Sequence, residues 1–278
     1  MKKLFDDLSF KISKQTTKQY STSFSLGILA LSSKIRNPIY AIYGYVRLAD
    51  EIVDSFHGFD KEKLLSRFRD DTFLALEEKI SLNPIMQAFQ ETVSQYEIDH
   101  ELIKQFLRSM EMDLHKIDYN SELYKEYILG SAEVVGLMCL HIFVNGDKAE
   151  FERLKPSAMI LGSAFQKVNF LRDMKDDYDV LGRTYFPNVD IKAFDNQVKL
   201  EIENEITNEF QLALEGIKKL PTSSRFGVYL AYRYYLSLFK KIKKTSATKM
   251  INQRIRISNS KKISLMMGSY VEYKMLSI

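Results

Sequence analysis

Two pairs of aspartates draw attention because the members of each pair are four residues apart. RLADEIVD contains Asp50 and Asp54, and DMKDD repeats the spacing with Asp173 and Asp177. On an α-helix, residues four apart lie about 6 Å from each other on one face, so each pair is repulsive on its own. Magnesium typically binds one or two carboxylates together with phosphate oxygens. The pairs therefore predict a metal diphosphate site, with Mg²⁺ as the expected ion and Mn²⁺ as the alternative.

The neighbours of these aspartates strengthen the prediction. Asn169 lies four residues before Asp173 and Gln166 one turn earlier, which adds amide groups to the same helix face. A guanidinium group binds phosphate oxygens with its fork of donors. Such groups flank both motifs, at Arg47, Arg172 and Arg183. A lone Asp-x-x-x-Asp pair is more often a solvated helix surface, but two pairs in similar company favour a binding site.

The elements that must position these residues are helices. Apolar residues recur at spacings of three and four along the chain, whereas alternation of period two is scarce. Only RIRIS, residues 254–258, resembles a strand. We predict an all-α architecture in a single domain, residues 1–278. The expected helices lie near residues 4–14, 21–31, 37–55, 61–80, 84–94, 99–115, 121–144, 147–153, 157–178, 190–218, 222–245 and 258–275.

The five prolines are interpreted as boundaries between these helices. Pro38 and Pro84 each follow an asparagine, which predicts an N-cap residue with proline at the first helical position. Pro156 falls between two periodic segments and predicts a break there. Small residues near the aspartates, such as Gly44 and Gly162, predict close helix contacts or a cavity.

Composition indicates a cytoplasmic protein. The single cysteine, Cys139, lies in an apolar run and permits no internal disulfide. The N-terminus is charged where a signal peptide is apolar, and we find no run of roughly 18 uncharged apolar residues. Residues 222–278 hold twelve Lys or Arg against a single acid, so the remainder holds 28 against 35. This basic end suits phosphates, anionic lipid or nucleic acid, or it is simply a solvated lysine surface.

Several functional classes lack sequence support. The chain has no Gly-x-Ser-x-Gly motif and no Gly-x-Gly-x-x-Gly fingerprint, and its four histidines form no metal-binding or triad signature. It also has no zinc-ligand spacing and no tryptophan for base stacking. We therefore expect no nucleic-acid partner, although the basic end keeps that alternative open.

The motifs resemble those of the squalene/phytoene synthase family. YSTSFSLGILAL is similar to its N-terminal Ser-x-Ser-Phe helix, and YAIYGYVRLADEIVD to its first aspartate motif. LGSAFQKVNFLRDMKDDYDVLGRTYFP resembles the second aspartate motif, and MEMDL and YILGSAEVVGLM match two further blocks. The resemblance covers nearly the whole chain and implies the class I isoprenoid synthase fold, with helices around a central cavity.

The resemblance also implies roles for particular residues. The implied metal and diphosphate ligands are Asp50, Asp54, Asn169, Asp173 and Asp177. Contacts to diphosphate or to the reacting carbons are implied for Tyr43, Arg47, Gln166, Arg172 and Tyr235, with Arg183 as a further phosphate contact. The implied cleft residues are Ser21, Ser23 and Phe24. The family usually has glycine where this chain has Glu133, a carboxylate that could alter the cavity wall or pair with an arginine.

The activity that the resemblance implies is the head-to-head joining of two prenyl diphosphates through a cyclopropylcarbinyl diphosphate. RIRIS followed by Lys261 and Lys262 is similar to the closing block of bacterial phytoene synthases. This favours geranylgeranyl diphosphate as substrate, phytoene as product and no NADPH. Alternatives are a squalene or dehydrosqualene synthase acting on farnesyl diphosphate, or a noncatalytic helical binding protein. An apolar product further predicts transient contact with a membrane surface, at the inner face of the cell membrane.

Overall fold

The structure is a computed structural model that describes residues 1–115, 119–187, 189 and 194–275. Every regular element in these ranges is helical, which confirms the all-α prediction. The helices are α1 (Lys2–Tyr20), α2 (Thr22–Leu29), α3 (Ser33–Asp54), α4 (Lys61–Glu78), α5 (Pro84–Gln95), α6 (His100–Met112), α7 (Ser121–Ile128), η1 (Leu129–Glu133), α8 (Val134–Phe143), α9 (Lys148–Asp179), α10 (Asn196–Lys218), α11 (Thr222–Lys243), α12 (Ala247–Met250) and α13 (Asn259–Met275).

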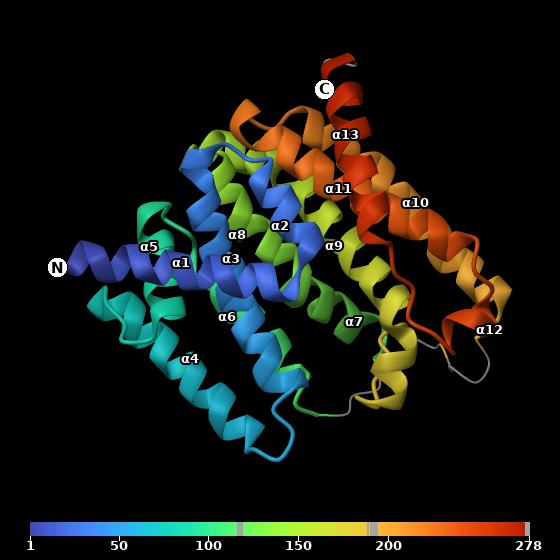
Figure 1. Ribbon diagram of the computed structural model, residues 1–278. Coiled ribbons are helices and arrows are strands. Elements are labelled where there is room, and N and C mark those ends of the chain that lie inside the picture. The colour runs from blue at the N-terminus through green and yellow to red at the C-terminus, as the bar shows by residue number, and fades with distance from the viewer. Residues whose placement is uncertain (116–118, 188, 190–193, 276–278) are drawn as a thin grey trace.

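The helices form two groups around a shared middle (Figure 1). The first group is α1 to α6, in which α1 packs across α3 and α5. The second group is α9 to α13, in which α9 packs on α10 and α11. Helix α8 lies between the groups and contacts α3, α6 and α9. As a result, α3 and α9, which carry the two aspartate motifs, both border the centre of the molecule.

Short polar side chains cap the N-termini of several helices. Asn83 accepts hydrogen bonds from the backbone N–H groups of Ile85 and Met86, and Pro84 takes the first helical position as predicted. Such caps satisfy N–H groups that have no partner inside the helix. The same kind of cap is formed by Asp60, Asp99, Asn120, Asp147 and Asp195.

Two boundaries predicted at prolines are wrong, and α1 ends six residues later and α10 begins six residues later than expected. Helix α9 runs unbroken from Lys148 to Asp179, so Pro156 lies inside it and not between two helices. Helix α3 begins at Ser33, which places Pro38 one turn inside the helix and not at its first position. A proline in these positions removes one backbone hydrogen bond, and the packing on both sides of each helix outweighs that loss.

The segment Ser121–Phe143 is a continuous helical stretch, in which α7 and α8 are joined by a π-helical turn, η1. By length and composition alone it could cross a membrane, with 44% of its most apolar window buried in the protein. Its packing offers a different explanation for the apolar residues, because α8 contacts three helices and residues of η1 and α8 line the cavity described below. Residues 254–258, the possible strand, form an extended segment without strand pairing.

Two glycines permit close contacts of η1. A Cβ atom on Gly130 would lie 2.6 Å from the Gln105 carbonyl oxygen of α6, and one on Gly162 of α9 would lie 2.8 Å from the Ala132 carbonyl oxygen. These distances are too short for any larger residue. The close approach predicted around Gly162 is therefore present. It packs α9 tightly against η1, and both elements line the cavity described below.

Candidate functional site

A cavity of about 1000 Å³ lies between the two groups of helices. Its wall comes mainly from α2, α3, η1, α8, α9, α10 and α11, together with the extended segment before α13. Of the residues predicted to form the site, all fourteen line this cavity: Ser21, Ser23, Phe24, Tyr43, Arg47, Asp50, Asp54, Gln166, Asn169, Arg172, Asp173, Asp177, Arg183 and Tyr235. The two aspartate motifs therefore face a common space.

The cavity has a charged end and an apolar end. Along α3, the lining changes from Ile39 and Ile42 to Arg47, Asp50 and Asp54. At 1.5 Å per residue, Ile39 and Asp54 are about 22 Å apart along the helix axis. Helix α9 repeats the gradient, from an apolar N-terminal half to the polar stretch that contains both aspartates. The shape suits an elongated apolar molecule with an anionic head.

Both aspartate motifs lie at the carboxyl ends of their helices. Asp54 is the last residue of α3, and Asp177 lies in the last turn of α9. The carboxyl end of a helix carries a partial negative charge, so acidic side chains there are electrostatically unfavourable. The two helix ends and their carboxylates thus produce a concentrated negative potential, which attracts cations.

Asp54 is partly neutralised by Arg183. The Arg183 guanidinium donates a hydrogen bond of 2.8 Å to Asp54 and one of 2.6 Å to the carbonyl oxygen of Asp113. Asp113 is buried and also accepts hydrogen bonds from Tyr127 and Tyr185. Burial raises the pKa of Asp113 to about 6 although Arg183 opposes the rise. Arg183 therefore connects the first motif to α6 as well as facing the cavity.

Asp173 is held by two arginines. Arg172 donates a 2.9 Å hydrogen bond to Asp173, and Arg254 of the extended segment lies 2.7 Å from the same carboxylate. Arg254 also pairs with Asp176 at 3.6 Å. The backbone N–H of Ile255 bonds to the Arg172 carbonyl oxygen, which fixes the segment against α9. The basic end of the chain thus contributes directly to the site.

Asp50 and Asp177 lack comparable neutralisation. Asp50 has Arg47 only at 4.0 Å, and Asp177 has no ion pair within 4.0 Å in the described ranges. Burial, and then repulsion by Asp54, raises the pKa of Asp50 to about 8. Burial, and then repulsion by Asp173, raises the pKa of Asp177 to about 8. Each motif therefore presents one paired and one weakly compensated carboxyl group.

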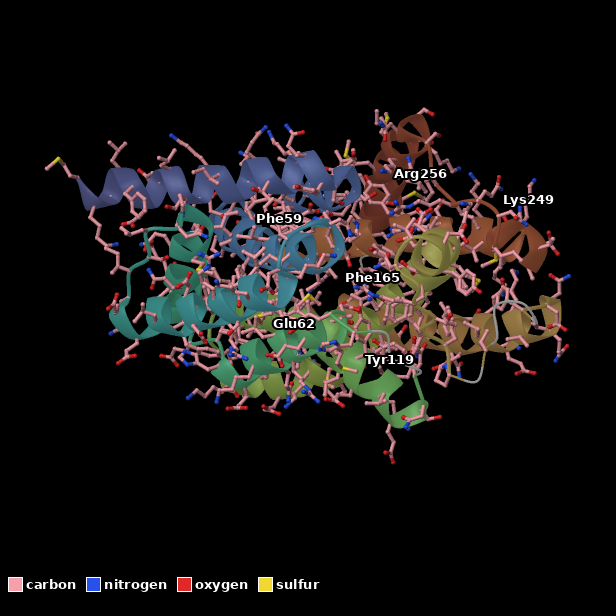
Figure 2. All side chains as sticks on the ribbon, turned by 90° about the horizontal axis from the view of Figure 1, so that it is seen from below. Phe59, Glu62, Tyr119, Phe165, Lys249 and Arg256 are labelled. Atoms are coloured by element: carbon pink, nitrogen blue, oxygen red, sulfur yellow. The ribbon has the colours of Figure 1, made fainter. Side chains whose placement is uncertain are left out.

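Aromatic and amide side chains continue the wall from the charged end. The hydroxyl of Tyr235 donates to the amide oxygen of Asn169 at 3.2 Å, and the amide of Asn169 donates to Gln166 at 3.3 Å. The ring of Tyr235 stacks on Phe165 at 3.9 Å, and Figure 2 shows Phe165 near the centre of the molecule. Phe24 belongs to the same aromatic group, because the centroid of its ring lies 6.2 Å from that of Tyr235.

On the opposite wall, Arg47 ion-pairs with Glu51 and lies over the ring of Tyr20 at 4.4 Å. Its guanidinium is thus positioned by a carboxylate and an aromatic ring one turn from Asp50. Burial raises the pKa of Tyr43 to about 12, against a hydrogen bond to Ser21 that lowers it. Tyr43 is therefore a neutral hydroxyl in the cavity wall.

Sequence reasoning missed several residues of the site. Asp113 lies in the block MEMDL, whose spacing gives no sign of its contact with Arg183. Arg254 and Lys262 lie far along the chain but line the cavity. Burial, and then the neighbouring Arg172, lowers the pKa of Lys262. Two signals were available in the sequence: the excess of basic residues after residue 222, and the resemblance of MEMDL and of RIRIS with its following lysines to blocks of the family. Neither identified these residues as part of the site.

Glu133, the departure from the usual family pattern, does not line the cavity. Burial, and then repulsion by Glu209, raises the pKa of Glu133 to about 7, whereas Lys167 lowers it. Its charged surroundings are thus a lysine and another glutamate on α9 and α10, and not an arginine of the cavity wall.

The donor set of the cavity fits a divalent cation that shares its coordination with a ligand. Four carboxylates and the amide oxygen of Asn169 are oxygen donors of the type that Mg²⁺ accepts. Across the described part of the chain, no three His, Cys, Asp or Glu residues lie close enough to enclose a metal by themselves. This agrees with the preference of Mg²⁺ for a few carboxylates completed by phosphate oxygens and water.

A helical bundle around an elongated cavity with two facing aspartate motifs is the class I isoprenoid synthase fold. The sequence pattern of the family described as squalene/phytoene synthase matches residues 17–261. The chain therefore belongs to the squalene/phytoene synthase family, as the resemblance predicted.

Relatives and solved structures agree with this assignment. The chain is 26% identical to phytoene synthase 1 of Solanum lycopersicum, a chloroplastic protein, over 91% of its own length and 66% of the relative's. It is also 26% identical to phytoene synthase of Arthrospira platensis, covering 92% of this chain and 90% of the relative. The chain thus spans just under two thirds of the chloroplastic relative.

Among solved structures, a dehydrosqualene synthase in complex with a ligand superposes with a TM-score of 0.81 and 20% identity, over 97% of this chain and 98% of that one. The squalene synthase HpnC of Alicyclobacillus acidocaldarius gives a TM-score of 0.73 and 20% identity, over 85% and 93%. These likenesses confirm the fold.

Proposed function

We propose that the protein joins two prenyl diphosphates head to head and releases diphosphate, as a phytoene synthase does. The observation that carries the proposal is the convergence of Asp50, Asp54, Asp173 and Asp177 on the charged end of an otherwise apolar elongated cavity. Geranylgeranyl diphosphate is the proposed substrate, and the phytoene synthases of two organisms support it as relatives of nearly the whole chain.

Mg²⁺, or Mn²⁺ in its place, would be held by the four aspartates and Asn169. When bound, it would neutralise the charge that develops on the departing diphosphate. The chain's own cations supplement this role: Arg47, Arg172 and Arg254 surround the same end of the cavity. The metal would match the negative charge that the arginines leave uncompensated on the aspartates, and the arginines would bind the oxygens of the diphosphate.

The apolar end has a different task. In the proposed reaction, loss of diphosphate from one substrate leaves an allylic cation, which the double bond of the second substrate attacks. Loss of a proton gives the cyclopropylcarbinyl diphosphate. A second ionisation, rearrangement and proton loss give phytoene. Phe24, Phe165 and Tyr235 line the space beside the charged end, where aromatic faces stabilise cations and exclude water.

A second candidate is a dehydrosqualene or squalene synthase that acts on farnesyl diphosphate. The similarity of the fold to a dehydrosqualene synthase, with a TM-score of 0.81, is the observation that favours it. Squalene formation would additionally consume a hydride from NADPH, which the primary proposal does not require.

A product assay separates these candidates. Purified protein is incubated with Mg²⁺ and either geranylgeranyl or farnesyl diphosphate, with and without NADPH, and hydrocarbon and diphosphate are quantified. Phytoene formed without NADPH is the expected result. Conversion of farnesyl diphosphate alone would establish the second candidate. Absence of diphosphate release from both substrates would overturn the enzymatic proposal and favour a noncatalytic binding protein.

We further propose that the protein works in the cytoplasm with transient contact to the inner face of the cell membrane. The hydrocarbon product is too apolar to leave through water, so transfer into lipid is its natural route. Flotation with vesicles measures this contact, and equal distribution of the protein with and without lipid would contradict it.

A further inference from the structure

Helix α13 carries an uncovered row of apolar side chains. These residues follow one another at helical spacing, so they share a face. Each has more than half of its surface exposed: Ile263 (54%), Met267 (67%), Tyr270 (53%), Val271 (53%) and Met275 (78%). Isolated apolar residues on a protein surface are ordinary, but five on one helix face form a patch that calls for a partner.

The opposite face of α13 already has its partner. Tyr273 lies with its ring 5.1 Å from that of Phe226 of α11, and Ser269 is fully buried. Tyr270 stands at the border between the two faces, because its ring also lies 5.6 Å from that of Phe226. Helix α13 packs chiefly on α11. The helix is therefore apolar on both sides, whereas an ordinary surface helix has a polar outer face. Figure 1 shows α13 on the outside of the molecule, running toward the C-terminus.

The charges of α13 are sorted between its two faces. Glu272, the only acid after residue 222, is on the inner side, where it ion-pairs with Arg233 and accepts a 3.0 Å hydrogen bond from Tyr229. The charged residues exposed on α13 are Lys261 and Lys274, one near each end of the apolar row. An apolar face flanked by lysines is the pattern of a helix that lies in the interface of an anionic bilayer.

The position of α13 links this face to the cavity. Lys262 in the first turn of α13 lines the cavity, as do Arg256 and Ile257 of the segment that leads into the helix. Arg256 lies at the edge of the molecule next to α13 in Figure 2. A surface attached through α13 would therefore lie beside the cavity wall.

We propose that the face of α13 formed by Ile263, Met267, Tyr270, Val271 and Met275 docks in the plane of an anionic lipid bilayer, with Lys261 and Lys274 at the headgroups. This inference rests on the proposed function, because an apolar product is the reason for a membrane contact. The surface itself is identified from the exposure and charge of its residues, without reference to the reaction. This face of α13 is thus the region that would make the membrane contact proposed above.

A second copy of the chain fits this face less well. In an antiparallel pairing of two α13 helices, Lys261 of each copy would approach Lys274 of the other. The exposed face offers no acid to neutralise them, because Glu272 is engaged on the inner side. Like charges opposed across an interface disfavour association, whereas anionic headgroups would neutralise both lysines.

Flotation of the full chain with phosphatidylcholine vesicles, with or without phosphatidylglycerol, tests the proposal. Wild-type protein is expected to float with the anionic vesicles. The double variant M267D/V271D should reduce the bound fraction by roughly tenfold or more, because two charges would enter the interface. Its matched control is L74D/L212D, which places the same charges at exposed leucines of α4 and α10 and should float like wild type. K261E/K274E should abolish the preference for anionic lipid.

The opposing outcomes are equally specific. Equal flotation of M267D/V271D and wild type, or no flotation of wild type, would overturn the proposal. The proposal would also be overturned if sedimentation showed a wild-type dimer that M267D/V271D dissociates, while vesicle binding stayed unchanged.

Circular dichroism and thermal unfolding verify that each variant is folded. Diphosphate release from detergent-dispersed substrate is measured in parallel and should be equal in wild type and M267D/V271D. Flotation without any diphosphate release would overturn the proposed function and leave α13 docking intact.

Discussion

Two charged clusters involve helix α9, and they differ in whether every carboxylate has a cation within hydrogen-bond distance. The first, which we call the closed cluster, consists of Lys167, Ser163, Glu205 and Glu209. Lys167 is buried and ion-pairs with Glu205 and Glu209, and Ser163 donates a 2.9 Å hydrogen bond to Glu209. None of its three ionisable residues lines the cavity.

The second, which we call the open cluster, consists of the four motif aspartates. It begins six residues further along α9, less than two turns away. Its carboxylates face the cavity, and Asp50 and Asp177 have pKa values raised to about 8 by burial and by their neighbouring aspartates. A structural cluster supplies its own counterion, whereas a cluster built for a ligand leaves part of its charge uncompensated. The comparison thus predicts a ligand-binding role for the open cluster and a structural role for the closed cluster.

The largest effect is expected from the open cluster. Asp173→Asn should lower turnover by roughly a thousandfold or more, since a proposed ligand of the metal diphosphate is lost. The free energy of unfolding should change by less than about 1 kcal/mol, because the removed repulsion with Asp177 offsets the lost ion pairs with Arg172 and Arg254. Steady-state diphosphate release and urea unfolding measure the two quantities.

Asp179→Asn is the matched control for this variant. Asp179 lies in the last turn of α9, pairs with Lys175 and does not line the cavity. Its turnover should remain within about twofold of wild type. If Asp173→Asn chiefly unfolded the protein while the released product per folded molecule was unchanged, the open cluster would be structural.

The closed cluster should respond in stability and not in turnover. Lys167→Met should lower the free energy of unfolding by about 3 kcal/mol, because the largely buried carboxylate of Glu209 would lose its cation. Lys175→Met on the same helix removes an exposed ion pair and should cost less than about 1 kcal/mol. Should Lys167→Met fail to fold, Lys167→Met/Glu209→Gln should restore folding, since the unpaired charge is then absent. Equal stability of wild type and Lys167→Met would contradict the assignment.

The open cluster was accessible to sequence reasoning because its information is local. A spacing of four places Asp50 with Asp54 and Asp173 with Asp177 on one helix face wherever the helix lies. The all-α fold was predictable for the same reason, from apolar periodicity. That both pairs would face a common cavity followed only from the family resemblance.

The parts that escaped prediction depend on contacts between distant residues. Lys167 and Glu209 form an ion pair although they are 42 residues apart in the sequence, and Arg183 and Asp54 do so although they are 129 residues apart. No spacing rule reports such pairs. The prediction of a helix break at Pro156 was wrong because it considered the effect of proline on an isolated helix. Tertiary packing keeps α9 continuous through this residue. The roles assigned to individual site residues stay predictions for the assays above.

A smaller effect is expected at the edge of the open cluster. Tyr235→Phe removes the hydroxyl that donates to Asn169 at 3.2 Å but keeps the ring that stacks on Phe165. Loss of one hydrogen bond is worth about 1 kcal/mol, so turnover should fall roughly fivefold. Tyr232→Phe, a buried tyrosine of the same helix outside the cavity lining, should leave turnover unchanged. Equal turnover of all three proteins would show that Asn169 is positioned without Tyr235.

The smallest effect on turnover is expected where the closed cluster meets η1. Burial raises the pKa of Glu133 from 4.5 to about 7 in the folded protein. A carboxyl group with a raised pKa binds its proton more tightly when folded, so its contribution to stability is present at low pH. That contribution is lost as the pH rises from about 4.5 to about 7. Glu133→Gln cannot ionise, so its unfolding temperature relative to wild type should rise across this interval and level off above it. Turnover of Glu133→Gln should match wild type, because the side chain lies outside the cavity lining. A constant difference in unfolding temperature at every pH would mean that Glu133 is already ionised against Lys167.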